Sequence, residues 1–569
     1  MMIPVVIEGS FGAYHWAPGP AVLICPPFGY EANATQRIWR DLARRLVEVG
    51  VAVLRLDLPG TGNAAGHPTD PGQVPAWQAA LDAAITWLGA RHGGRVALLG
   101  HRFGALLALD AAARGAKVER LVLLDPPATG ALFARGLRAR ARLEQNPPAP
   151  EGPDFIQAWD VPLSTETLAG LAALPADPQG RALPPVLLAM PGPPDTAAWP
   201  AWLAREPDAV TAIDYAGHDR FAQQESLVTQ APEDVFARIV ATLGAAATAT
   251  MPAAPPPLPM TLDLPEGTEE TIRFGAGGLL VGTLTHPRQP NPDAAAVVLP
   301  SIGNLPRCGY ARLWTDLARV LAAQGIASLR FDAGQVGDSE GEEQPDRLAA
   351  SYATQRIAEV RDAVDAMARR GHPRSLLIGH CSGAYAGWLA ALQEPRIVGL
   401  LVSNPQFLTR QTRLSRATLH RPPGMAETDP RLQASDKTAT PPRSQFQPSL
   451  LQRLKRRCPL VVRHALRRLG AEERATRQAL RTLTRRGCAV HFVFAAGDSG
   501  MVRLQRAFGE VPRLPRLAQL SVIEGADHNF AARQHRAQLL HEAAGFALRA
   551  ATPRRPTFAA YSPAMELPA

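Results

Sequence analysis

One helix-and-strand pattern occurs twice in this chain of 569 residues, at a constant spacing of 275 residues. An amphipathic segment followed by an apolar one spans 39–57, and the same arrangement returns at 314–332. Ten residues of the first copy are identical in the second: Trp39, Asp41, Leu42, Ala43, Arg44, Leu46, Gly50, Leu54, Arg55 and Asp57. So long a period predicts a duplicated domain, because the repeats of solenoid proteins are only about 20–50 residues long.

The composition between the two copies predicts where one domain ends and the next begins. Residues 246–262 are rich in Ala and Pro and have no apolar period, which is typical of an extended linker. We therefore expect domains at 1–245 and 263–550 and a disordered, proline-containing tail at 551–569. The chain is also too long for a single hydrophobic core.

Each half alternates short apolar runs with segments of helical period. The runs of the first half lie at 21–25, 51–57, 95–100, 118–125, 185–190 and 209–215. Those of the second half lie at 295–300, 326–332, 375–379, 397–403, 489–495 and 518–524. Runs this apolar are typical of strands buried on both faces, so we predict the α/β class with two doubly wound, mostly parallel sheets. Residues 271–287 are predicted to form an antiparallel hairpin at the edge of the second sheet.

The formal net charge of +9 is concentrated in one segment, because residues 407–487 hold about 19 Lys or Arg against about 5 Asp or Glu. We interpret residues 408–485 as a solvated, Arg-rich helical insertion that caps the second domain. A surface for acidic ligands, nucleic acid or anionic lipid is the alternative. No apolar run is long enough to span a membrane, and the start lacks the pattern of a secretory signal, so a cytoplasmic protein is expected.

The five cysteines are far apart and form no C-x-x-C pair, so we expect free thiols and no metal site. One of them, Cys381, occupies the centre of the string Gly379-His-Cys-Ser-Gly383, between an apolar strand and a helix. A strand, a G-x-nucleophile-x-G turn and a helix together make a nucleophile elbow. A thiol at a helix N-terminus beside an imidazole is readily ionised, which predicts that Cys381 is the nucleophile. An inert buried thiol, or a shifted elbow with Ser382 as the nucleophile, remains open.

The other catalytic groups are expected after the elbow, in the order acid and then histidine. Asp498 ends an apolar strand, and His528 follows the next strand, so His528 is predicted to be the general base oriented by Asp498. Asp527 is the alternative acid. The backbone N–H groups of Ser382 and Ile302 are predicted to form the oxyanion hole.

In the first half, Arg102 stands at the nucleophile position of Gly100-His-Arg-Phe-Gly104. A guanidinium stays protonated and cannot attack a carbonyl, so this half is predicted to be non-catalytic. Asp195 and His218 keep the places of an acid and a base. With Arg102 they form a possible anion-binding site.

These motifs carry two family resemblances. The first half, with Pro26-Pro27-Phe28-Gly-Tyr-Glu31-Ala-Asn33 and GHRFGALLAL (100–109), resembles the exosortase A system-associated hydrolase 2 group, departing from it at His101 and Phe103. The second half, with LRFDAGQVGDSEG (329–341), GHCSGA (379–384) and GADHNF (525–530), resembles α/β-hydrolases of the serine aminopeptidase-like superfamily, especially cysteine-elbow members near exosortase A hydrolase 1. The resemblance implies two tandem α/β-hydrolase domains and an exopolysaccharide or protein-sorting context.

Together these features predict a hydrolase or acyltransferase that acts on an ester, thioester or amide without a cofactor. The expected partner is a small or acylated substrate with an anionic group, and no nucleic acid is expected. Weak peripheral contact with a membrane is an alternative role of the basic segment, and a wholly non-catalytic scaffold is the alternative for the chain.

Overall fold

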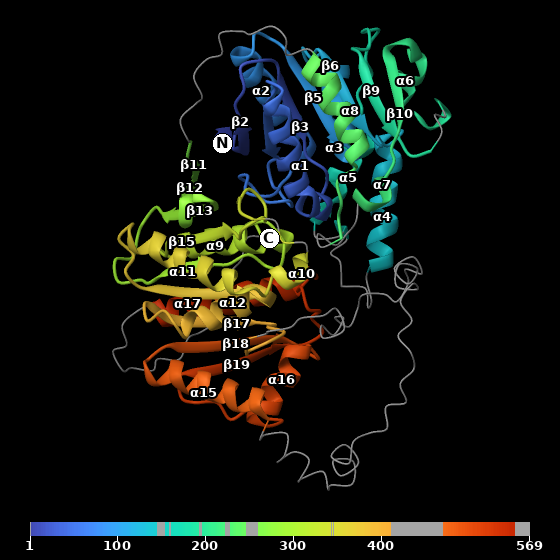
Figure 1. Ribbon diagram of the computed structural model, residues 1–569. Coiled ribbons are helices and arrows are strands. Elements are labelled where there is room, and N and C mark those ends of the chain that lie inside the picture. The colour runs from blue at the N-terminus through green and yellow to red at the C-terminus, as the bar shows by residue number, and fades with distance from the viewer. Residues whose placement is uncertain are drawn as a thin grey trace, which may run out of the picture.

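Two large sheets, one from each half of the chain, organise the computed structural model (Figure 1). In Figure 1 the strands of the first half run from blue to green and those of the second half from green to red. The structure describes residues 2–144, 154–158, 161–192, 196–221, 228–245, 260–342, 344, 346–410 and 470–551. All statements below refer to these residues.

The first sheet has the order β1-β2-β4-β3-β5-β6-β9-β10. Its strands are β1 (Met2–Ile7), β2 (Ser10–His15), β3 (Ala21–Cys25), β4 (Ala52–Asp57), β5 (Val96–His101), β6 (Arg120–Leu124), β9 (Val186–Met190) and β10 (Val210–Asp214). The six strands from β3 onward are parallel and match the six predicted apolar runs. The antiparallel hairpin of β1 and β2 was not predicted, and it joins the sheet by pairing β2 with β4.

The second sheet has the order β11-β12-β13-β15-β14-β16-β17-β18-β19. Its strands are β11 (Leu262–Leu264), β12 (Gly267–Phe274), β13 (Leu280–Pro287), β14 (Ala296–Leu299), β15 (Ser328–Asp332), β16 (Ser375–His380), β17 (Ile397–Ser403), β18 (Ala489–Ala495) and β19 (Ala518–Ile523). The six predicted parallel strands are confirmed. The predicted hairpin is also confirmed as β12 and β13, next to the edge strand β11.

Helices cover both faces of each sheet, because neighbouring strand residues such as Val22 and Leu23 enter separate hydrophobic clusters. In the first half, α1 (Tyr30–Glu48) and α8 (Glu233–Gly244) cover one face, and α2 (Gln73–Arg91) and α3 (Phe103–Ala113) cover the other. In the second half, α9 (Leu313–Ala323) and α17 (Arg533–Ala551) face α11 (Thr354–Ala368), α12 (Cys381–Ala391), α15 (Ala471–Arg485) and α16 (Ser499–Phe508) across the sheet. This is the doubly wound arrangement that the sequence predicts.

Smaller elements connect these layers. They are α4 (Gly130–Glu144), β7 (Phe155–Ala158), β8 (Val161–Ser164), α5 (Thr165–Ala172), α6 (Ala201–Arg205), α7 (His218–Phe221) and α10 (Arg347–Ala350). Among the described helices, none has the length and apolarity needed to cross a membrane.

The predicted insertion at 408–485 is described only at its two ends. Its last part is α15, which packs on α16 and β18 and buries Leu480 and Leu483 in the core. Residues 471–485 therefore belong to the helical layer of the sheet and not to a cap. Residues 411–469, most of the predicted linker and the tail from 552 onward lie outside the described residues.

Candidate active site

Cys381 lies at the turn between β16 and α12, in a backbone conformation that a cysteine rarely adopts. Its φ is 51°, in the left-handed region, and this strained turn holds the thiol at the N-terminus of α12. The N–H of Ser382 contacts the Cys381 sulfur. A helix N-terminus and a backbone N–H both favour a negative charge at this place.

The two glycines of the motif permit this turn. A Cβ built on Gly379 would lie 2.7 Å from the backbone of Ala384, and one on Gly383 would lie 2.7 Å from the carbonyl oxygen of Ser301. A side chain at Gly379 would push α12 away from β16, and one at Gly383 would push α12 away from the loop after β14. The spacing of the motif is therefore a packing requirement of the turn.

His528 and Asp498 meet although they are 30 residues apart in the sequence. Asp498 ends the loop after β18, and its Oδ2 lies 2.6 Å from Nδ1 of His528. Its other oxygen accepts a hydrogen bond of 2.8 Å from the N–H of Gly500, at the start of α16. Because both carboxylate oxygens are bound, the acid is fixed in orientation. The other ring nitrogen of His528, Nε2, is buried with no oxygen or nitrogen partner among the described residues.

Electrostatics favour an ion pair between Cys381 and His528. Burial lowers the pKa of His528, but the Cys381 thiolate and the hydrogen bond to Asp498 raise it to about 10. Burial opposes ionisation of Cys381 as well, but interactions with His528, Tyr352 and the N–H of Ser382 lower the pKa of its thiol. Both shifts therefore favour a thiolate on Cys381 and a protonated imidazole on His528.

Asp527 and the Ser382 hydroxyl, the alternative acid and the alternative nucleophile, make hydrogen bonds that do not involve His528. Asp527 is exposed and accepts hydrogen bonds from the N–H groups of Asn529 and Ala531, within its own loop. The hydroxyl of Ser382 accepts a hydrogen bond of 2.8 Å from the N–H of Gly303. Asp498 is thus the carboxylate brought to His528, and the Ser382 hydroxyl holds the loop after β14.

That loop carries Ile302, which is buried. The hydroxyl of Ser301 donates to the carbonyl oxygen of Phe331 and accepts from the N–H of Ala333, both at 2.8 Å. These bonds fix the loop against the end of β15. The role of the Ile302 N–H as an oxyanion donor stays a prediction.

Asn404 was not predicted as a site residue, although it follows a strand end like the other functional groups. Its φ is 41° and its side chain is fully buried. The side-chain amide donates to the carbonyl oxygen of His528 at 2.7 Å and accepts from the N–H of Ala495 at 2.9 Å. Asn404 therefore ties the histidine loop to the end of β18.

Tyr352 and Gln406 were also missed. The Tyr352 hydroxyl lies 3.9 Å from the Cys381 sulfur and donates to Oε1 of Gln406 at 3.2 Å. Burial and the neighbouring thiolate raise the pKa of Tyr352, so the hydroxyl keeps its proton. Its single proton can be directed either at Gln406 or at the Cys381 sulfur. No sequence motif marks this pair, because its members come from two loops 54 residues apart.

The equivalent turn of the first half holds Arg102, also with a positive φ, of 48°. Its guanidinium pairs with the buried carboxylate of Glu31 at 2.5 Å and lies 3.9 Å from the carboxylate of Asp125. Burial raises the pKa of Glu31, and Arg102 acts in the opposite direction. The anion that Arg102 holds is thus the protein's own carboxylate, and an external anion would have to compete with it.

The remaining predicted members of that first-half site are His218 and Asp195, and His218 acts electrostatically on Asp125, the second carboxylate beside Arg102. His218 begins the short helix α7, and Asp195 lies outside the described residues. Anion binding at Arg102, Asp195 and His218 stays a prediction. Among the described residues, no group of three or more His, Cys, Asp or Glu side chains is placed to hold a metal ion.

The chain belongs to the alpha/beta hydrolase family, whose model matches residues 22–262 and 296–543. Both halves are therefore members of one family, in agreement with the two sheets. No curated protein matches the chain.

Solved structures that resemble it each cover about half of the chain. An esterase from Pyrococcus furiosus is 11% identical, covers 52% of this chain and 100% of its own, and has a TM-score of 0.31. A dienelactone hydrolase from Anabaena variabilis is 13% identical, with coverages of 50% and 99% and a TM-score of 0.30. An α/β serine hydrolase without a lid from Xanthomonas campestris is 16% identical, with coverages of 52% and 99% and a TM-score of 0.29.

Proposed function

We propose that the second half is a cysteine-dependent hydrolase that cleaves an ester, thioester or amide through Cys381, His528 and Asp498. The observation that carries this proposal is the 2.6 Å contact between Asp498 and His528, beside a thiol whose pKa is lowered at a strained helix N-terminus. A carboxylate that orients the histidine and a base that acts on the thiol are the neighbours that these proposed roles require.

The proposed reaction begins with the Cys381 thiolate, which attacks the carbonyl carbon while the carbonyl electrons move to oxygen. The N–H groups of Ser382 and Ile302 would stabilise that oxyanion. Protonated His528 gives its proton to the leaving alcohol, thiol or amine, which leaves an acyl-thioester on Cys381. Neutral His528 then takes a proton from water, whose hydroxide releases the acid and restores the thiolate. An alcohol or amine in place of water would make the same site an acyltransferase.

The first half is proposed to be a non-catalytic partner of this hydrolase. Arg102 cannot act as a nucleophile, and its charge is balanced by Glu31. The resemblance of both halves to exosortase A-associated hydrolases motivates a further proposal, that the substrate belongs to an exopolysaccharide or protein-sorting pathway. Arg102 also favours the competing proposal, that the whole chain is a scaffold without activity.

An acylation experiment decides between hydrolase and scaffold. The protein is mixed with short-chain p-nitrophenyl esters and acyl-CoA thioesters, and its intact mass is measured soon after mixing. We expect an acyl adduct on Cys381 and release of p-nitrophenol. Cys381→Ala should lose both, whereas Ser382→Ala should keep the adduct. The buried thiol variant Cys488→Ala is the matched control. Absence of any adduct and any turnover across the panel would favour the scaffold.

Tyr352 offers a second test, of the thiolate itself. Tyr352→Phe removes the hydroxyl donor near the sulfur, so the pKa of Cys381 should rise and alkylation by iodoacetamide should need a higher pH. The measurement is the alkylation rate as a function of pH. Tyr385→Phe is the control, because it removes a hydroxyl from the neighbouring ring, whose centroid lies 5.2 Å from that of Tyr352. An unchanged profile in Tyr352→Phe would remove Tyr352 from the site.

A further inference from the structure

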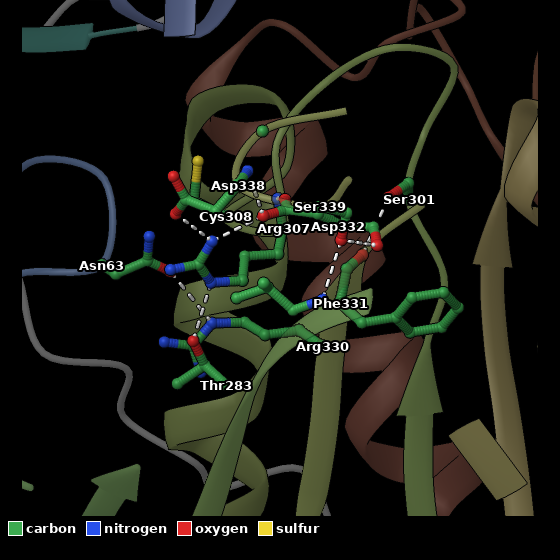
Figure 2. Close-up of polar contacts among 12 residues, drawn as sticks. Asn63, Thr283, Ser301, Arg307, Cys308, Arg330, Phe331, Asp332, Asp338 and Ser339 are labelled. Carbon is green, nitrogen blue, oxygen red and sulfur yellow. Dashed lines mark hydrogen bonds and ion pairs between the residues drawn. The ribbon is translucent and has the colours of Figure 1, made fainter. Parts of the chain in front are cut away.

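The contacts between the two halves repeat under the same spacing of 275 residues that relates their sequences. Arg55 of the first half donates to Asp338 of the second at 2.5 Å. The two residues at the equivalent positions, Arg330 and Asn63, also meet, with 3.4 Å between the Arg330 Nε and the Asn63 Oδ1. Figure 2 shows Asn63 and Arg330 directed toward each other, beside Asp338 and Arg307.

A second pair of contacts follows the same rule. The guanidinium of Arg40, in α1, donates to the carbonyl oxygen of Gly337 at 3.2 Å. At the equivalent positions, the hydroxyl of Thr315, in α9, donates to the carbonyl oxygen of Gly62 at 3.1 Å. Helix α1 thus binds the loop after β15, and α9 binds the equivalent loop after β4.

One contact joins two equivalent positions to each other. Asn33 and Cys308 are 275 residues apart, and the Cys308 sulfur lies 3.4 Å from the Asn33 Oδ1. In a twofold arrangement, equivalent residues touch each other only beside the axis. This pair therefore marks the axis that relates the two halves.

The surfaces that meet are built in the same way. Gly62 and Gly337 both have a positive φ, of 48° and 51°, and a Cβ on either would collide with the carboxylate of Asp57 or Asp332 at the preceding strand end. Asp57 accepts from the N–H of Asn63 at 2.8 Å, as Asp332 accepts from the N–H of Asp338 at 3.0 Å. The loops after β4 and β15 therefore have the same conformation, and each faces the other half.

We infer that the chain is a twofold dimer of two domains fused into one polypeptide. The first half docks on the second through non-covalent contacts, as a separate subunit of a dimer would. In the first half the docking surface is formed by α1 and the loop after β4, and in the second half by α9 and the loop after β15. Each surface fits an alpha/beta hydrolase domain that presents the equivalent helix and loop. Arg40, Arg55 and Asp338 are all buried in this contact, as the central residues of a stable interface are. The inference does not depend on the proposed activity.

The dimer arrangement also brings the first half to a cleft of the second. Arg37 of α1 lines a cavity of about 40 Å³ together with Gly337 and Asn304, and Asn304 follows the loop that carries Ile302. At the equivalent place, Arg312 and Gly62 line a cavity of about 100 Å³ on the first half. Each half therefore supplies part of the wall of a cavity beside the other.

The test uses the full chain with a specific protease site inserted between Ala245 and Met260. After complete cleavage, we expect the two fragments to elute together in size-exclusion chromatography at low micromolar concentration. In the cleaved protein, Arg40→Ala removes the guanidinium that donates to the carbonyl oxygens of Gly337 and Ser339 in the second half. It should weaken association at least about tenfold, measured by dilution and light scattering.

Arg45→Ala is the matched control, since Arg45 lies on the same helix but pairs with Glu233 of its own half at the surface. It should leave association unchanged. Circular dichroism of the cleaved Arg40→Ala protein shows whether each fragment remains folded. Separation of the cleaved wild-type protein into two folded fragments would overturn the inference, as would equal association of the Arg40→Ala and Arg45→Ala proteins.

Discussion

Replacing His528 with alanine is expected to reduce turnover of an activated ester by about 10⁴-fold or more, because the variant loses the general base and the proton donor together. The same change should be visible without any substrate. In the wild-type protein, His528 is the main group that lowers the pKa of Cys381. Without it, burial dominates, and alkylation of Cys381 at neutral pH should slow sharply.

The sign of the pH dependence follows from these two groups. Because the thiol pKa is lowered, the reactive thiolate should persist below the pH of about 8.5 at which an ordinary cysteine ionises, and it should be lost as the solution becomes more acidic. His541→Ala, on the exposed side of α17, is the control and should keep the wild-type profile. A His528→Ala protein with the wild-type alkylation profile would contradict the ion pair.

Replacing Asp338 with alanine is expected to destabilise the protein by about 3–5 kcal/mol, because two arginines lose a buried partner at once. Asp338 pairs with Arg55 of the first half at 2.5 Å and with Arg307 of the second half at 2.8 Å. The measurement is the midpoint of denaturant unfolding. Glu233→Ala removes the exposed partner of Arg45 and is the control, expected to cost at most about 1 kcal/mol. A cost for Asp338→Ala as small as that of the control would contradict the network.

The carboxylate of Asp338 also predicts how the free energy of unfolding depends on pH. Burial opposes its ionisation, but Arg55 and Arg307 hold the pKa of Asp338 well below its usual range. A lowered folded pKa contributes stability above the unfolded value of about 3.9, and this contribution is lost as the pH falls below it. Asp338→Asn should therefore be less stable than wild type at neutral pH, and the difference should shrink in acid.

Sequence reasoning located the strands and could propose Cys381, Asp498 and His528 as candidate site residues, because both follow local rules. The apolar runs that form β3 and β14 need no knowledge of their neighbours. Cys381 could be found from the glycines that flank it. Asp498 and His528 follow from the order of strand ends, because the chemistry of parallel sheets gathers where the strands end.

The contacts that were missed join loops without any local pattern. Asn404 and Gln406 lie in the loop after β17 and Tyr352 lies after α10, and only the folded chain brings them to Cys381 or His528. The β1–β2 hairpin was missed because Pro4 interrupts the apolar run of β1 and β2 lacks a strict apolar alternation.

The docking of the two halves could not be read from the repeat alone. The spacing of 275 residues shows that Arg55 corresponds to Arg330 and Asn63 to Asp338. It does not show that these positions face each other, because a duplicated domain can pack through any of its surfaces.

The buried arginines of the two halves differ in where their charge is balanced. Arg330 is neutralised within its own half by Glu269, at 2.9 Å, and meets only the neutral Asn63 across the contact. Among the described residues, the carboxylate bound to Arg55 is Asp338, which belongs to the other half. During synthesis the first half is made before Asp338, so Arg55 can pair with this carboxylate only after that part of the second half has been made. The second half therefore holds carboxylates for its own buried arginines, Arg307 and Arg330, whereas the carboxylate that pairs with Arg55 is supplied only when the two halves dock.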